Sequence, residues 1–264
     1  MNDNGLYVTP VWLDPAFHRN LKIGPLEDFS VAAGMHAAYL TANEFPQASV
    51  ELPIVFVRTA PRDAAGGGTV SPIVLLGVVP GENLQVEDGR WIARYIPSSI
   101  RRYPFLSSGV VNGEPSRVLV DIAWKGLSET AGVPLFEADD KPSPTLQAVL
   151  DYLRRFEQDV ENTQALCRRI VELDLLKPMK ADLTLGDGSM LTVDGFEVIE
   201  DEKLQALPDA QVIELHRSGM LALMQLQLLS LSNMRHMVDR KWRRVQQQAA
   251  ATAAPNAAAP TPAA

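Results

Sequence analysis

The chain has 264 residues, of which 46% are hydrophobic and 21% charged, and its formal net charge is −8. These proportions are typical of globular proteins and exclude a wholly disordered or collagen-like chain. Because an acidic chain repels phosphate, we expect a poor general binder of nucleic acid and of anionic lipid, and no nucleic-acid partner. The single cysteine, Cys167, excludes an internal disulfide and a zinc site built from cysteines.

Short β-branched and apolar runs predict strands in residues 1–144: Leu52 to Arg58, Ile73 to Val79 and Arg117 to Ile122. Between the first two, Pro61 to Gly68 ends in three glycines and predicts a flexible loop. Asp88-Gly89 predicts a hairpin turn between runs that contain Val86 and Trp91. Strands this short, separated by turn residues, favour a β-rich region built as a bent sheet or small barrel.

Residues 145–245 predict a helical region. Ser143 and Pro144 form a helix start, and apolar residues then recur at steps of three and four as far as Leu173. Alternation with a period of two predicts a β-hairpin over 181–200, followed by helices from Asp209 to Arg217 and from Met220 to about Val245. The expected fold class is therefore α+β, with a β-rich N-terminal half and a helical C-terminal half that carries one hairpin.

The two ends of the chain allow predictions about a disordered C-terminal tail and about the cellular location of the protein. Residues 246–264 hold no charge and no large apolar side chain, so we expect a disordered Ala/Pro-rich tail. The first ten residues show no basic segment followed by an apolar run, which indicates no cleaved signal peptide. The most apolar stretch, Gly219 to Leu231, is shorter than the roughly 18 residues of a membrane span. We expect a cytoplasmic protein, with export to the cell surface without a cleaved signal as the alternative.

No motif for a cofactor or a catalytic constellation is visible. The sequence contains no P-loop, no dinucleotide-binding glycine pattern and no nucleophile elbow. The four histidines show no metal-ligand spacing. We therefore expect no cofactor and no locally encoded metal site.

The most unusual segment, residues 89–105, holds four arginines among four aromatic residues: Arg90, Arg94, Arg101, Arg102, Trp91, Tyr95, Tyr103 and Phe105. A guanidinium group binds carboxylate or phosphate in bidentate fashion and stacks on rings, so the segment predicts a site for an anion or an aromatic ligand. The alternative, which the frequency of Arg–aromatic packing favours, is that these arginines pair with acidic neighbours and cover the aromatic core.

Three further features are candidates. His18 and Glu44 could share a proton if the fold brings them together, whereas the alternative is a turn-capping histidine and a surface glutamate. The basic segment Arg235 to Arg244 around Trp242 could touch a membrane surface or nucleic acid, but an ordinary basic helix end is favoured. Cys167 and the methionines at 220, 224, 234 and 237 lie at helical spacing, which predicts core packing.

Six ordered segments resemble a known family: Glu44-Phe45-Pro46, Leu52-Pro53-Ile54-Val55-Phe56, Gly81-Glu82-Asn83-Leu84 with Gly89-Arg90-Trp91, Arg101-Arg102-Tyr103-Pro104-Phe105, Leu175-Leu176-Lys177-Pro178-Met179 and Leu228-Leu229-Ser230-Leu231. In this order, over about Val8 to Val238, they are similar to the SapC family of bacterial proteins, which is distinct from the peptide-transport permease of similar name. The resemblance implies a link to a surface layer, or an accessory role in metabolism or nutrient uptake. It also implies a histidine just before Leu-Ser-Leu, where this chain has Gln227, an amide that does not titrate.

Three functional hypotheses remain. The favoured one is a non-catalytic accessory or interaction protein, which contacts a partner or a second copy of itself through its amphipathic helices. The second is a small-molecule binder or enzyme with an Arg/aromatic anion site, for which the candidate residues are His18, Glu44, Arg94, Arg101, Arg102 and Tyr103. The third is a surface-layer component.

Overall fold

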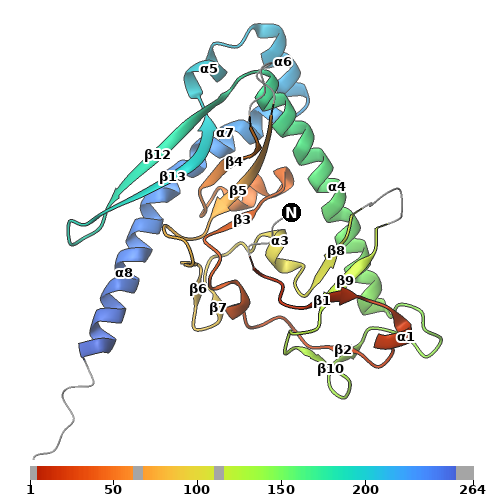
Figure 1. Cartoon of the computed structure of the whole chain (residues 1–264). Coiled ribbons are helices and arrows are strands. Elements are labelled where there is room, and N and C mark those ends of the chain that lie inside the picture. The colour runs from red at the N-terminus through yellow and green to blue at the C-terminus, as the bar shows by residue number, and fades with distance from the viewer. Residues whose placement is uncertain (1–4, 62–67, 110–115, 254–264) are drawn as a thin grey trace, which may run out of the picture.

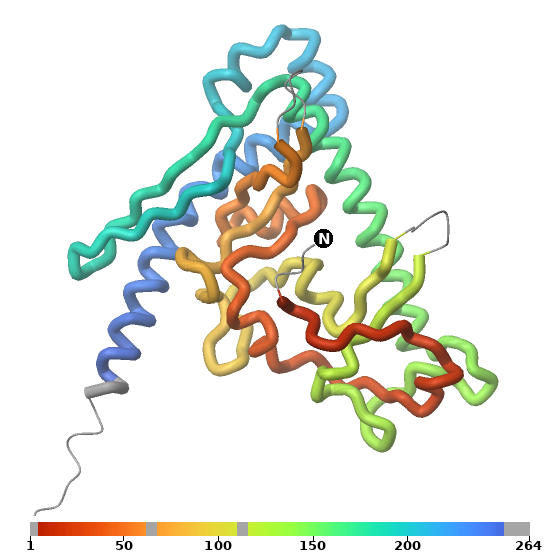
Figure 2. The backbone as a smooth tube through the Cα atoms, in the orientation of Figure 1, coloured from red at the N-terminus to blue at the C-terminus, as the bar shows by residue number. Residues whose placement is uncertain are grey.

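The computed structural model describes residues 5–61, 68–109 and 116–253. The long helix α4 (Pro144–Glu172) runs along one side of a roughly triangular molecule (Figure 1). One end of α4 lies beside the small N-terminal strands and the other end lies beside the largest sheet, as the backbone trace shows (Figure 2). Helix α4 therefore connects the two parts of the fold.

The largest sheet is antiparallel and has the strand order β12-β13-β4-β5-β3. Its strands are β3 (Ala37–Tyr39), β4 (Ile54–Ala60), β5 (Thr69–Leu75), β12 (Leu176–Thr184) and β13 (Met190–Ile199). The predicted strand at Leu52 to Arg58 and the predicted hairpin are confirmed. The run predicted as a strand to Val79 ends at Leu75, because the chain turns at Gly77, where a Cβ atom would lie 2.0 Å from the carbonyl oxygen of Glu82.

The other strands form three smaller open sheets, in the orders β1-β9-β8, β10-β2-β11 and β6-β7. These strands are β1 (Pro10–Trp12), β2 (Lys22–Ile23), β6 (Val86–Glu87), β7 (Arg90–Trp91), β8 (Phe105–Ser107), β9 (Val118–Asp121), β10 (Leu127–Ser128) and β11 (Val133–Pro134). The α+β class and the Asp88-Gly89 turn, at which both residues have positive φ, are confirmed. The small barrel is not: within the described residues the strands are divided among open sheets, and none pairs round into a closed ring.

The helical half follows the predicted order. Ser143 caps α4 by accepting a hydrogen bond from the Leu146 amide, as its place before Pro144 predicts. The remaining helices are α1 (Pro15–His18), α2 (Phe45–Ala48), α3 (Ser98–Arg101), α5 (Asp201–Gln205), α6 (Asp209–Arg217), α7 (Met220–Ser230) and α8 (Met234–Ala253). The 3₁₀ turns are η1 (Ser30–Ala32), η2 (Ala42–Glu44) and η3 (Leu231–Asn233).

The single helix predicted from Met220 to about Val245 is divided into α7 and α8 by η3. At this turn the Ser230 hydroxyl accepts from the Ile54 amide, and the Asn233 amide donates to the Ser49 carbonyl. Both polar side chains thus bond to backbone outside the helices. Helix α8 continues to Ala253, so the first residues of the predicted tail are helical, and residues 254–264 lie outside the described part of the chain.

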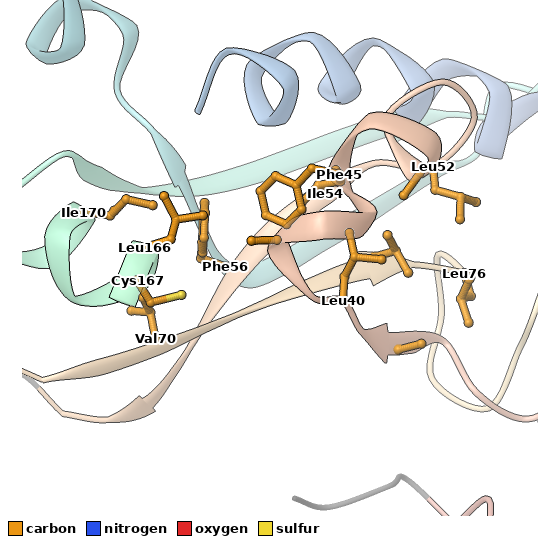
Figure 3. Close-up of a cluster of buried hydrophobic side chains, with 14 of the residues drawn as sticks. Leu40, Phe45, Leu52, Ile54, Phe56, Val70, Leu76, Leu166, Cys167 and Ile170 are labelled. Carbon is orange, nitrogen blue, oxygen red and sulfur yellow. The ribbon is translucent and has the colours of Figure 1, made fainter. Parts of the chain in front are cut away.

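The main core lies between the large sheet, α2, α4 and α7, and includes Phe45, Ile54, Leu166 and Ile170, each at most 1% exposed (Figure 3). Side chains from both predicted regions, 1–144 and 145–245, therefore pack together. Cys167 belongs to this core, where burial raises the pKa of its thiol to about 12. The predicted inert role of Cys167 agrees with this environment. Among the described helices, none is both long and apolar enough to cross a membrane.

Candidate functional site

A groove of about 690 Å³ lies between α3 with β8 on one side and the first half of α4 on the other. Figure 1 shows β8 beside this part of α4. The lining is mostly apolar and comes from two segments: Arg101, Arg102, Phe105, Ala148, Val149, Tyr152 and Leu153 are among its residues. Two of the candidate residues from the Arg-aromatic segment therefore meet at one concave surface, together with α4 residues that the sequence did not single out.

Arg101 is held at this groove by uncharged partners. Its Nη2 atom donates to the Ser98 hydroxyl at 2.8 Å and to the Tyr95 hydroxyl at 3.3 Å. Its Cζ atom lies 5.5 Å from the centre of the Tyr95 ring and 5.9 Å from that of Tyr152. Among the residues that the structure describes, no carboxylate lies within ion-pair distance of Arg101. These contacts orient its charge, and none of them comes from a carboxylate.

Arg102 and Tyr103, in contrast, are buried and contact residues of the interior. The Arg102 guanidinium lies 4.8 Å from the centre of the Phe156 ring, and only 7% of the residue is exposed. Tyr103 is 4% exposed and donates its hydroxyl to Asp121 at 3.2 Å. Burial, with a smaller contribution from Asp121, raises the pKa of Tyr103. Of the two, only Arg102 is among the residues that line the groove.

Glu44 is a buried residue that joins several segments through hydrogen bonds, and not a surface glutamate. Its carboxylate accepts from the amide and hydroxyl of Thr41 at 2.9 and 2.8 Å. It also accepts from the Tyr95 hydroxyl and the Ser98 amide, both at 2.6 Å. The Thr41-x-x-Glu44 pattern of a capping box was the signal in the sequence that could have predicted this. Glu44 thus fixes Tyr95 and Ser98, the two residues that orient Arg101.

The structure does not bring His18 to Glu44. His18 lies at the end of α1, where its Nδ1 atom is 3.0 Å from the Asp14 carbonyl oxygen and 3.2 Å from the Asp14 amide. Every hydrogen bond described for Glu44 goes to Thr41, Tyr95 or Ser98. The turn-capping alternative therefore describes this histidine, and the shared proton has no geometric support.

The other arginines of the segment lie apart from the groove. The Arg94 side chain is 88% exposed, and its Nε atom is 3.7 Å from the Glu51 carboxylate. The Arg94 amide also donates to Glu51, at 2.6 Å. Arg90 is an exposed residue of the short strand β7. The segment is thus divided: Arg94 pairs with an acidic neighbour, whereas Arg101 lines the groove, where an anion site stays a prediction.

The basic residues of α8 contact the loop after β5. Lys241 forms an ion pair with Glu82 at 2.8 Å, and Arg240 bonds to the Gln85 side chain. Arg244 donates to the carbonyl oxygens of Asn83 and Val86 at 2.8 and 2.7 Å. Burial lowers the pKa of Arg240. These cations attach α8 to the body of the protein, and because α8 continues to Ala253 they lie within the helix and not at its end.

Gln227 occupies the position at which the resemblance implies a histidine. It is fully buried; its side chain accepts from the Ile199 amide at 3.1 Å and donates to the Ile54 carbonyl at 2.9 Å. The amide joins β13 to β4, two strands whose ladder consists of the single pair Glu197 and Phe56. Its place in the structure is that of a structural bridge.

Comparison with known proteins adds one finding. The family model described as SapC matches residues 13–237, a range that includes every residue lining the groove. No curated protein and no solved structure matches the chain. Within the described residues, no group of three or more potential metal ligands is present.

Proposed function

The chain belongs to the SapC family, and we propose that it is a non-catalytic accessory protein whose groove binds a small organic anion. The observation that carries this proposal is that the Arg101 guanidinium is held in place by uncharged groups at the groove. Its guanidinium is fixed by Ser98, Tyr95 and Tyr152, faces an apolar groove and has no described carboxylate partner. A cation held in this way gains most from an anion that brings its own apolar surface.

The energetics favour a ligand with both properties. A hydrogen bond to a charged group contributes about 1.5–3 kcal/mol, and each methylene group removed from water adds about 0.8 kcal/mol. Since Ser98, Tyr95 and Glu44 already hold Arg101 in place, little side-chain entropy is lost when the anion binds. An inorganic anion would pair with the Arg101 guanidinium but would leave the apolar wall of the groove exposed to water.

The first prediction concerns the charge of Arg101. We expect Arg101→Gln to weaken binding of 1-anilinonaphthalene-8-sulfonate, a sulfonate with an apolar ring system, by about tenfold or more, because one charge-assisted contact is lost. Fluorescence titration measures this affinity. Arg94→Gln is the matched control, since it removes the same charge from a side chain that is 88% exposed and lies away from the groove.

Thermal unfolding of both variants shows whether the fold is kept. Equal affinity of the wild type and both variants for the sulfonate would remove the proposal. A loss in Arg101→Gln alone, at an unchanged melting temperature, supports it.

The cellular role is proposed on the same ground. A protein that holds a small anion without converting it fits an accessory role in nutrient uptake. Residence in the cytoplasm is the matching location, and a link to a surface layer stays a prediction from the family resemblance. Cell fractionation with detection of the protein distinguishes the two: recovery with the cell surface would favour the surface-layer role.

A further inference from the structure

We infer that the anion is a linear aliphatic carboxylate, with its carboxylate on Arg101 and its chain along α4; this inference rests on the proposed function. The α4 residues at the groove follow one face of the helix at steps of three and four, through Thr145, Ala148 with Val149, and Tyr152 with Leu153. Pro144 and Leu153 are nine residues apart, which corresponds to about 13 Å along a helix. The groove is thus long relative to the short segment, Arg101 with Arg102, that supplies its charged side chains.

The polar end of the groove is fixed by Arg101. Its Cζ atom lies 5.9 Å from the Tyr152 ring, and the Tyr152 hydroxyl is 3.4 Å from the Ser98 carbonyl oxygen, so α3 meets α4 at that turn. The opposite end is the start of α4, where the buried Ser143 hydroxyl already accepts from the Leu146 amide. A carboxylate therefore has its partner at the Arg101 end, and the ligand's chain points toward Pro144.

The lining favours an aliphatic body over a planar aromatic one. The Tyr152 ring already contacts the Arg101 guanidinium, at 5.9 Å, and Phe105, the other aromatic residue in the lining, is only 3% exposed. The middle of the α4 wall consists of Ala148, Val149 and Leu153, all aliphatic. Ala148 leaves the free space, since its neighbours along the same face are larger.

The length of the groove determines how many carbon atoms of the ligand it can hold. An extended chain advances about 1.2 Å per bond, so about ten carbons span the distance from Tyr152 to Pro144. Shorter acids leave apolar wall exposed, and longer ones extend past the start of α4. Affinity is therefore expected to rise with chain length and then to level off near decanoate.

Isothermal titration with straight-chain carboxylates from butanoate to tetradecanoate, below their micelle concentrations, tests this inference. We expect affinity to rise about two- to fourfold per methylene up to about ten carbons and then to stay constant. Decanol, which lacks the charge, is expected to bind about tenfold or more weakly, and Arg101→Gln to lower the affinity for decanoate but not for decanol.

The variant Ala148→Leu tests the contribution of the ligand's aliphatic chain to affinity separately from that of its carboxylate. Leucine is a good helix former at this exposed position, so the helix is kept while the groove is filled. We expect decanoate to bind about fivefold or more weakly and butanoate unchanged, because only the longer chain passes Ala148. Thermal unfolding of the variant serves as the folding control.

Two outcomes overturn the inference in different ways. If the sulfonate probe depends on Arg101 but carboxylates show no dependence on chain length, the aliphatic ligand is wrong and the anion site stands. If neither the probe nor the carboxylates depend on Arg101, the proposed function fails as well.

Discussion

Single side chains carry connections in this fold that backbone pairing does not provide. Strands β13 and β4 share one ladder pair, and the Gln227 amide supplies the next link by bonding to Ile199 and Ile54. An amide can do this because it donates and accepts at once. Asp121 also connects segments, since its buried carboxylate accepts hydrogen bonds from the backbone amides of Val8, Thr9 and Ala123.

Replacing Gln227 by glutamate tests this bridge. An ionised glutamate cannot donate to the Ile54 carbonyl, and a buried carboxylate has its pKa raised, so we expect a loss of about 1–3 kcal/mol or more at pH 7. The protonated acid both donates and accepts. The loss should therefore be smaller at pH 4 than at pH 7, in urea unfolding compared with the wild type at each pH. An equal loss at both values would contradict the bridge.

Residue patterns predicted local contacts and missed distant ones. The Ser143 cap and the Asp88-Gly89 turn are encoded within a few neighbouring residues, and the structure has both. Tyr152 and Ala148 were not predicted at the site, because their partners on α3 lie about fifty residues earlier and only the packing of α4 brings them together. The division of the arginine segment has the same cause, since Glu51 beside Arg94 and Tyr152 beside Arg101 are both distant from the segment in sequence.

At the scale of elements, α4 packs through an apolar stripe, whereas α8 combines apolar contacts with several bonds from cationic side chains. The buried stripe of α4 follows the predicted spacing and includes Leu153, Phe156, Leu166 and Ile170. Beyond Met237, α8 contacts the body through Lys241, Arg240 and Arg244, and the Trp242 ring lies against Gly186 of the β12–β13 turn. The sequence showed the cations but not the loop that receives them.

Removing one of these cations should loosen α8. We expect Lys241→Met to lower the free energy of unfolding by about 1–2 kcal/mol, because it leaves the partly buried Glu82 carboxylate without its ion-pair partner. Arg235→Met, at an exposed position of the same helix, is the control and should change stability by less than about 0.5 kcal/mol. Urea unfolding compares the two variants. Equal stabilities would show that the ion pair does not hold α8.

At the scale of the whole molecule, the shared core contains groups that resist ionisation. Burial raises the pKa of the Tyr39, Tyr95 and Tyr103 hydroxyls, and that of the Cys167 thiol to about 12. In the unfolded chain these groups lose their protons near their ordinary values of about 8.5 for cysteine and 10 for tyrosine. The unfolded state then binds fewer protons than the folded state, so stability falls as pH rises.

This predicts a stability that is nearly constant from pH 7 to about 8.5 with respect to these groups and declines above it. For Cys167 alone the slope is about 1.4 kcal/mol per pH unit between its unfolded and folded pKa values. Urea midpoints measured at pH 7, 8.5 and 10.5 check this decline. Cys167→Ala should reduce the slope between pH 9 and 10, and an unchanged slope would contradict the burial of the thiol.

The central claim is that Arg101 receives the carboxylate of a ligand in the groove. Nuclear magnetic resonance of the arginine Nε–H groups tests it most directly, with the Arg101 signal assigned by its absence in Arg101→Gln. During titration with decanoate, we predict that the Arg101 signal shifts in a saturable way and that Arg94 and the arginines of α8 do not, while decanol leaves all of these signals in place. Saturable shifts confined to Arg94 or α8, or no shift at Arg101, would contradict the account.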